Sequence, residues 1–283
     1  MKKLFILAFA ALGMLACTGQ NDPSNPDNPI NGELTGAFSV SESQKVHFSQ
    51  GNLRYQASTN KWQFAEHQWD TIGSANANMS DSYAGWIDLF CWGTGDNPTK
   101  EIDVKSGEDY PFAEWGDNPI TNGGNKAKMW RTLTKDEWLY LFCTRTNAAT
   151  LFALGSVNGV NGAILLPDNW VLPAGASFIA STQQGFELNN ICYRQTNYDN
   201  YYDNNNIYTA EQWAVMESAG AVFLPAAGYG PYTLSRFFSG GCYWSATSCS
   251  SSGAYSLYFE SEGLYPQSSK GERDERLSVR LVR

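Results

Sequence analysis

The sequence predicts an α+β domain, and two observations carry that prediction. Segments in which apolar and polar residues alternate occur near both ends of the chain, within residues 45–69 and 221–283, and such alternation is typical of half-buried strands. Two other stretches, residues 130–145 and 208–220, carry the start signals of helices. A chain of 283 residues with 14% aromatic residues has enough apolar material for a sizeable core.

The first 16 residues are typical of a cleaved export signal. Lys2 and Lys3 precede an apolar run too short to span a bilayer, and small residues lead to Cys17. The ending MLAC is similar to the lipobox of bacterial lipoproteins, in which the cysteine is lipidated, although Met14 replaces the usual leucine. We expect residues 1–16 to be removed and Cys17 to anchor the protein at the outer membrane or cell surface. The alternative is an ordinary secretory signal with an incidental cysteine.

The residues after the anchor predict a flexible tether followed by one domain. Residues 17–36 are rich in Asn, Pro, Asp and Gly and have almost nothing to bury, so we expect the single domain to cover residues 37–283. The formal charge of the chain is -9, and it becomes more negative once Lys2 and Lys3 leave with the signal. This charge repels a phosphate backbone, so we expect no nucleic-acid partner and contact with a membrane only through the lipid.

Five cysteines follow Cys17, and their spacing predicts no disulfide framework. Their number is odd and no CxxC pair occurs, so neither a complete set of disulfides nor a cysteine metal site is indicated. We expect mainly buried free thiols, and neither a metal ion nor another cofactor. These cysteines are Cys91, Cys143, Cys192, Cys242 and Cys249.

The first half of the expected domain divides into strands and loops. Residues 45–69 alternate around turn-forming positions and predict a meander of short strands. Residues 70–128 are mostly Gly, Asn, Asp and Ser between tryptophans. A short WG…GDNP element at residues 92–98 returns as WGDNP at residues 115–119, which indicates a reused turn and not a repeat architecture.

Two capping boxes predict the helices. Thr134 is followed three residues later by Glu137, and Thr209 precedes Glu211 and Gln212 in the same way. Gly220 is placed to end the second helix. We expect the apolar side chains of the helices and closing strands to lie in the core: Trp138, Leu141, Phe142, Trp213, Met216, Trp244 and Phe259.

The closing part of the chain predicts several more strands. Residues 162–175 contain an apolar strand-like stretch, residues 193–208 form a loop of Tyr, Asn and Asp, and four short alternating segments follow within residues 221–283. Arg273 and Arg280 lie inside this pattern, and we expect them to make structural hydrogen bonds or ion pairs.

The helix RTLTKDEWLYLF at residues 131–142 resembles the R-L-P-T-x-x-E-W-E-Y-A helix of the formylglycine-generating-enzyme and sulfatase-modifying-factor superfamily. The closing strands GCYWSAT, AYSLYF and SVRLVR resemble those of relatives that include bacterial surface lipoproteins and the variable proteins of diversity-generating retroelements. The resemblance implies a C-type-lectin-like fold, with two helices around twisted antiparallel sheets and a loop-rich face.

The chain departs from the catalytic and sugar-binding members of that superfamily. Cys242 and Cys249 are seven residues apart with no cysteine-rich motif around them, and no EPN, QPD or WND triplet of the calcium-dependent lectins is present. PDNW at residues 167–170 contains residues of these triplets in a different order, which does not predict a calcium site. We expect no catalytic residues, and we interpret the chain as a binding protein and not an enzyme.

The resemblance implies a ligand-binding surface near the C-terminus. The period-two pattern of AYSLYFES predicts that Leu257 and Phe259 are buried with Tyr255, whereas Ser256, Tyr258 and Glu260 face outward. Tyr and Ser on a rigid frame suit recognition of a protein or glycan, although exposed Ser and Glu can also be merely solvated. The expected ligand-binding residues are Cys249, Ser250, Ser251, Ser252, Ser256, Tyr258, Glu260, Glu262, Tyr265, Ser268, Ser269, Lys270, Glu272, Asp274 and Glu275.

Other surfaces and functions remain open from the sequence. The loop at residues 193–208 is a second candidate contact surface through Tyr193, Tyr198, Tyr201, Tyr202 and Tyr208. Ser, Tyr and Cys codons can arise when a retroelement randomises adenines, whereas the four glutamates near the C-terminus cannot. The alternatives to a binding protein are a formylglycine-generating-type oxidase and a structural component of an envelope or fimbrial assembly.

Overall fold

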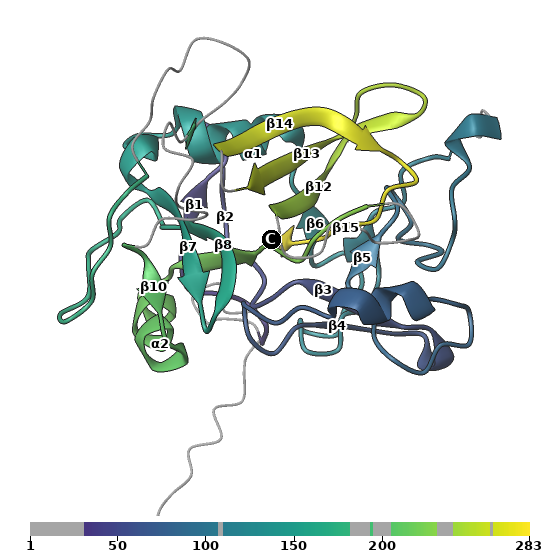
Figure 1. Cartoon of the computed structure of the whole chain (residues 1–283), viewed down its shortest axis with the longest axis horizontal. Coiled ribbons are helices and arrows are strands. Elements are labelled where there is room, and N and C mark those ends of the chain that lie inside the picture. Colours follow the sequence, from purple (N-terminus) through teal and green to yellow (C-terminus); the bar gives the residue numbers. More distant parts are fainter. Residues whose placement is uncertain (1–30, 107–109, 182–192, 195–204, 231–239, 261–262) are drawn as a thin grey trace, which may run out of the picture.

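The computed structural model describes residues 31–106, 110–181, 193–194, 205–230, 240–260 and 263–283 (Figure 1). Sheet dominates these ranges and only two short α-helices occur in them, so the expected α+β class is confirmed. None of the helices described combines the length and the apolar character needed to cross a membrane. Cys17, the expected lipid anchor, and most of the expected tether lie outside the described residues.

A six-stranded sheet forms the centre of the domain. Its long strands β12, β13 and β14 run antiparallel to one another and lie at the top of Figure 1, and short strands extend both edges. In order across the sheet, the strands are β5 (Leu89–Phe90), β15 (Leu277–Ser278), β12 (Gly240–Ser248), β13 (Gly253–Glu260), β14 (Gly263–Glu272) and β9 (Tyr193–Arg194).

A four-stranded sheet and three strand pairs complete the β-structure. The four-stranded sheet is ordered β10 (Ile207–Tyr208), β7 (Phe152–Val157), β8 (Val160–Leu165) and β11 (Val222–Pro225). The pairs are β1 (Phe38–Ser39) with β2 (Lys45–Val46), β3 (Leu53–Gln56) with β4 (Lys61–Phe64), and β6 (Arg131–Thr132) with β16 (Leu281–Val282). The β3–β4 hairpin confirms the expected early strands.

Both helices begin at the predicted capping boxes. In α1 (Lys135–Leu139), which continues as the π-helical turn Tyr140–Thr144, the Thr134 hydroxyl accepts from the Glu137 amide and the Glu137 carboxylate accepts from the Thr134 amide. Thr209 and Gln212 make the same reciprocal bonds at α2 (Ala210–Ser218). Gly220 follows α2 with a φ of 97°, a left-handed conformation that glycine adopts without steric cost. The short 3-10 helices are Ala57–Thr59, Gly73–Asn78, Val104–Ser106, Trp115–Asp117 and Ala148–Thr150.

The folded domain begins earlier than the sequence indicates. Glu33 bridges to Ser49, the Leu34 amide donates to the Phe48 carbonyl at 2.9 Å, and Leu34 is buried. Residues 31–36 therefore belong to the domain and not to the tether. Their composition hides this, because one leucine among polar residues and glycines gives no periodic signal.

One face of β12 and β13 covers the first core. Opposite residues of an antiparallel pair lie on the same side of the sheet. Tyr243 pairs with Leu257, and both side chains are fully buried together with Phe259. The apolar face of α1 joins this core through Trp138. The predicted core positions Leu257 and Phe259 are therefore confirmed.

The opposite face of the same strands covers a second core. Trp244 pairs with Ser256, and Trp244 is buried with Cys242 among the aromatic residues of β3 and β4. The expectation that the second face of β13 is open is wrong over the middle of the strand, because this core lies against it. Sequence alternation cannot distinguish a wet face from one that a distant segment covers.

Arg280 is buried beside the second core and makes structural hydrogen bonds, as expected. Its guanidinium donates to the Gln68 side-chain oxygen at 2.9 Å and to that of Asn52 at 3.4 Å. Asn52 in turn donates to the hydroxyl of Tyr243 at 3.2 Å. Burial lowers the pKa of Arg280 to about 10, so the side chain remains charged at neutral pH and needs these partners.

Candidate binding surface

The serine run between β12 and β13 forms an ordered turn. The Gly253 amide donates to the Ser250 hydroxyl at 2.9 Å, and the Cys249 amide donates to the Gly253 carbonyl at 3.0 Å. Arg273 holds the turn from the side, because its guanidinium donates to the Ser250 carbonyl at 2.7 Å and stacks over Trp92 at 4.4 Å. The backbone of this turn is therefore fixed mainly by contacts that do not use its serine side chains.

The exposed part of this region forms one group of side chains around the turn. We call this group the turn patch. The Cys249 thiol lies 3.9 Å from the carbonyl oxygen of Ser269 on β14, which joins the turn to that strand. The members of the turn patch are Cys249, Ser250, Ser251, Ser252, Ser269 and Glu272, all exposed or half-buried.

Three tyrosines pack together near the other end of β13 and form what we call the tyrosine patch. Tyr258 stacks on Tyr265 of β14 with ring centroids 5.7 Å apart, and it meets Tyr229 edge-on at 5.6 Å. The hydroxyls of Tyr229 and Tyr258 are 3.4 Å apart. Glu260 lies on the same side of the strand, and all four side chains are half-buried.

The surroundings of Tyr258 disfavour the ionised form of its hydroxyl. Burial raises the pKa of the Tyr258 hydroxyl, and the neighbouring Glu260 carboxylate and Tyr229 hydroxyl raise it further. A neutral phenol can donate one hydrogen bond while its ring supplies apolar contact area. The arrangement thus presents a ring fixed by two neighbours beside a carboxylate.

Ser256 differs from the expectation and lies between the two patches without being exposed. Only 1% of its surface is accessible, and its hydroxyl accepts from the Cys242 thiol at 3.5 Å. A buried serine on the Trp244 rung cannot contact a ligand from the outside. Along β13, the turn patch and the tyrosine patch are therefore separate, roughly 20 Å apart at the usual rise of a strand.

The remaining expected residues occupy varied places. Ser268 is half-buried on the Ser256 rung, and Asp274 and Glu275 are half-buried beyond the end of β14. The Asp274 carbonyl accepts from the Cys91 thiol at 3.4 Å, which ties this segment to β5. Glu262 and the side chain of Lys270 lie outside the described residues.

The described cysteines differ in oxidation state. Cys91, Cys242 and Cys249 are free, but Cys143 is disulfide-bonded, so the expectation of free thiols is wrong for that residue. Burial raises the pKa of the Cys242 thiol to about 12 and that of Cys91 to about 11. Both therefore remain protonated at neutral pH.

In the second candidate surface, the loop at residues 193–208, Tyr208 is buried and cannot contact a ligand. Tyr208 is 5% exposed, and its hydroxyl donates to the Ser177 carbonyl at 2.6 Å. It packs edge-on against Trp213 of α2, with ring centroids 5.8 Å apart, so it is a core residue. Tyr193 contributes its backbone to β9, and Tyr198, Tyr201 and Tyr202 lie outside the described residues.

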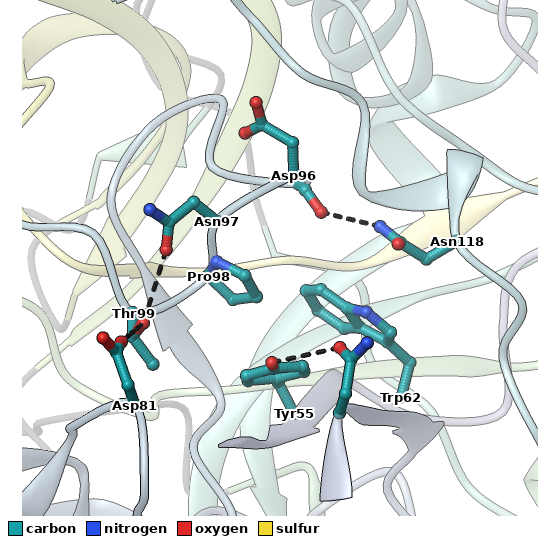
Figure 2. Close-up of a pocket in the computed structure, with 10 residues that line it drawn as sticks. Tyr55, Trp62, Asp81, Asp96, Asn97, Pro98, Thr99 and Asn118 are labelled. Atoms are coloured by element: carbon teal, nitrogen blue, oxygen red, sulfur yellow. Dashed lines mark hydrogen bonds between the residues drawn. The ribbon is translucent and has the colours of Figure 1, made fainter. Parts of the chain in front are cut away.

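The sequence interpretation missed a pocket beside the β3–β4 hairpin. It has a volume of about 320 Å³, and its lining includes residues of both copies of the GDNP element, Asp96 and Asn97 from the first and Asn118 from the second (Figure 2). The repeated element was visible as a motif. Only the fold shows that its two copies meet at one cavity.

Comparisons with known proteins found no relative of this chain at the level of family, sequence or structure: no family model, no curated protein and no solved structure matches it.

Proposed function

We propose that this chain is a surface lipoprotein, anchored through Cys17, that binds a protein or glycan ligand through its C-terminal region and has no enzymatic activity. We also propose that the domain has the C-type-lectin-like fold implied by its helix and closing-strand motifs. The tyrosine patch supports the binding role most strongly. Three packed tyrosines and a carboxylate at one end of a sheet provide contact area that needs little ordering on binding.

The turn patch provides the second part of the proposed contact region. Main-chain bonds and Arg273 hold the turn, so the side chain of exposed Ser251 can change while the frame persists. Such tolerance suits variation by a retroelement, which we include in the proposal for the turn patch. A reverse transcriptase gene beside an imperfect repeat of the codons for residues 240–283 would support it, and a genome without one would refute it.

The environment of Cys242 argues against the oxidase alternative. A reactive thiol needs a lowered pKa and access to substrate, whereas the Cys242 thiol is 6% exposed and burial raises its pKa. Cys242 lies under the tyrosine patch and supports packing there. The geometry gives no comparable support to an envelope or fimbrial component, which purified protein would reveal by assembling into fibres.

The binding proposal is tested by paired tyrosine variants of one strand. Tyr258 lies in the tyrosine patch, whereas half-buried Tyr255 faces the other side of β13, where the Lys135 ammonium lies 4.7 Å from its ring centroid. The protein would be screened on a glycan array and on an array of purified extracellular proteins. For a ligand found there, we expect Tyr258→Ala to weaken binding by about 1–2 kcal/mol and Tyr255→Ala to leave it unchanged.

Two results would contradict the proposal. One is equal affinity of Tyr258→Ala and the wild type for every ligand found on the arrays. The other is equal weakening by both variants at equal thermal stability, because the tyrosine patch would then have no special part in binding. Thermal unfolding of both variants separates lost contacts from a lost fold.

A further inference from the structure

A pocket lies on the β3–β4 side of the domain, away from the C-terminal surface. Figure 1 places β3 and β4 on the opposite side of β12 from β14. Tyr55 of β3 and Trp62 of β4 line the pocket, and the loop at residues 95–99 lies across from them (Figure 2). Tyr55 and Trp62 belong to the second core, and Tyr229 and Tyr258 pack against the same core, so the pocket and the tyrosine patch use different residues around it.

The two copies of the GDNP element build one wall of the pocket together. The Gly95 amide donates to the Ala113 carbonyl at 3.1 Å, and the Asn118 side-chain amide donates to the Gly95 carbonyl at 2.7 Å. A Cβ atom on Gly95 would lie 2.5 Å from the Glu114 carbonyl oxygen, so only glycine allows this approach. The wall is therefore a preformed structure and not a gap between mobile loops.

The floor of the pocket is equally fixed. Tyr55 and Trp62 are 8% and 3% exposed, and their ring centroids lie 4.6 Å apart. Trp62 also packs on Phe90 at 5.6 Å, which joins the floor to the second core. A floor held in this way keeps its polar groups in place before a ligand arrives.

Several polar groups around the pocket have one hydrogen-bonding position used and another open. Asp81 accepts from the Thr99 hydroxyl at 2.5 Å and Asp96 accepts from the Tyr110 hydroxyl at 2.5 Å, each through one oxygen. Asn60 accepts from Tyr55 at 3.1 Å. Within the described residues, the second oxygen of each carboxylate and the amide nitrogen of Asn60 have no hydrogen bond.

Asn118 supplies another acceptor whose orientation is settled by its neighbours. Its side-chain nitrogen donates to the carbonyls of both Gly95 and Trp115, so its side-chain oxygen is left for a ligand. Carboxylate and amide acceptors thus occur with amide donors around one cavity. A ligand that both donates and accepts can use all of these groups.

The charge of the lining excludes one class of polar ligand. It contains two carboxylates, Asp81 and Asp96, and no lysine or arginine. The nearby Lys100 ammonium lies 5.2 Å from the ring centroid of Tyr110, outside the lining. A phosphate, a sulfate or an acidic sugar would be repelled by the two carboxylates.

We propose that this pocket binds a neutral sugar residue, the terminal or internal pyranose of an uncharged glycan. Each sugar hydroxyl donates one hydrogen bond and accepts others, which matches the mixture of open acceptors and donors contributed by Asp96, Asn118 and Asn60. Tyr55 and Trp62 are 8% and 3% exposed, so recognition in this pocket relies on the polar groups and not on ring stacking. The volume is at the small end of ligand sites, as expected for one ring and part of its neighbour.

The test uses the full-length protein and sugars of defined charge. The probes are methyl glycosides of glucose, galactose, mannose and N-acetylglucosamine, disaccharides of these sugars, glucuronic acid, and calcium chloride alone. Calorimetry measures binding. We expect at least one neutral probe to bind with a Kd of about 1 mM or lower, and glucuronic acid to bind more weakly than glucose glycosides.

The variants compare equivalent positions in the two copies of the GDNP element. Asp96→Asn keeps an acceptor for Tyr110 and removes the charge, and Asn97→Ala truncates an exposed lining residue. Each should weaken binding about tenfold, the loss expected for one hydrogen bond to a polar or charged group. Asp117→Asn is the matched control, because Asp117 occupies the position of Asp96 in the second copy but is exposed outside the lining. It should bind as the wild type does.

Three outcomes would overturn the proposal. The first is no binding of any neutral probe at roughly ten times the expected Kd. The second is binding that all three variants retain or all three lose at unchanged thermal stability. The third is binding of calcium alone that Asp96→Asn abolishes, which would make the pocket a cation site. None of these results depends on ligand binding by Tyr258, so failure here leaves the C-terminal proposal standing.

Discussion

Replacing Asp168 with alanine should destabilise the domain strongly, because Asp168 is the counterion of a buried arginine. The guanidinium of Arg145 donates to the Asp168 carboxylate at 3.1 Å, and the Arg145 side chain is 1% exposed. The same carboxylate accepts from the amide and hydroxyl of Ser39 and from the Lys45 ammonium at 3.0 Å. One side chain thus links β1, β2 and the turn after α1.

The lowered pKa of Asp168 gives the lower limit of the stability that Asp168→Ala should lose. Partial burial alone would raise the pKa of this carboxyl, but the hydrogen bonds from Ser39, Lys45 and Arg145 outweigh burial and lower it from the ordinary 3.8 to about 2. Such a shift corresponds to about 2 kcal/mol of stability at neutral pH. Removing one partner of a buried pair costs up to about 5 kcal/mol, because the other charge stays buried. We therefore expect Asp168→Ala to lose about 2–5 kcal/mol.

The sign of the pH dependence follows from the lowered pKa. The stabilisation by Asp168 is fully present above its unfolded pKa of 3.8 and is lost as the pH falls through its folded pKa of about 2. The difference in unfolding free energy between the wild type and Asp168→Ala should therefore narrow below about pH 4. Lys45→Ala is the control, because Lys45 is 53% exposed and its loss should cost less than about 1 kcal/mol.

Urea unfolding followed by tryptophan fluorescence measures all three proteins at neutral pH and near pH 3. Equal losses for Asp168→Ala and Lys45→Ala would show that the buried guanidinium does not depend on Asp168. A difference that stays constant down to about pH 2 would show that the carboxylate charge contributes nothing. Either result would refute the reasoning.

Two further predictions concern the core and the anchor. Trp244→Ala should lower the unfolding free energy by about 3–5 kcal/mol, because Trp244 is 1% exposed and its indole nitrogen donates to the Phe90 carbonyl at 2.7 Å; an unchanged denaturation midpoint would contradict its place in the second core. Cells fed a labelled fatty acid should label the wild type and not Cys17→Ser, since the lipobox-like sequence predicts a lipid on Cys17. Equal labelling of the two proteins would rule out that anchor.

The elements predicted correctly depend on local signals. Both capping boxes form because each is a reciprocal pair of bonds within four consecutive residues, Thr134 with Glu137 and Thr209 with Gln212. Buried Trp138 and Trp213 follow from helical spacing, which is also local. The alternating closing segments likewise appear as strands β12 and β13, because period-two patterns need no knowledge of the partner strand.

Most of what the sequence could not predict depends on partners far away in the chain. Ser256 alternates with apolar residues as an exposed serine would, yet it is buried because Trp244 and the β3–β4 region lie over its face. The structural role of Asp168 in the PDNW stretch could not be predicted, because it depends on Arg145 and Ser39. The pocket at Asp96 and Asn118 was hidden for the same reason, because its lining comes from loops that meet only in the fold.

Burial of both faces of β13 restricts where this sheet can carry a variable or ligand-specific residue. A substitution at Ser256 or Leu257 has to fit one of two packed cores, where a change of volume is felt directly. Side chains at the two ends of the strand have solvent on one side, and the turn at one end is held by Arg273 through main-chain carbonyls. The exposed side chain of Ser251 can therefore change with little effect on folding, whereas a change at buried Ser256 would cost stability. This explains why residues as poor at core building as serine gather at the turn and not along the strand.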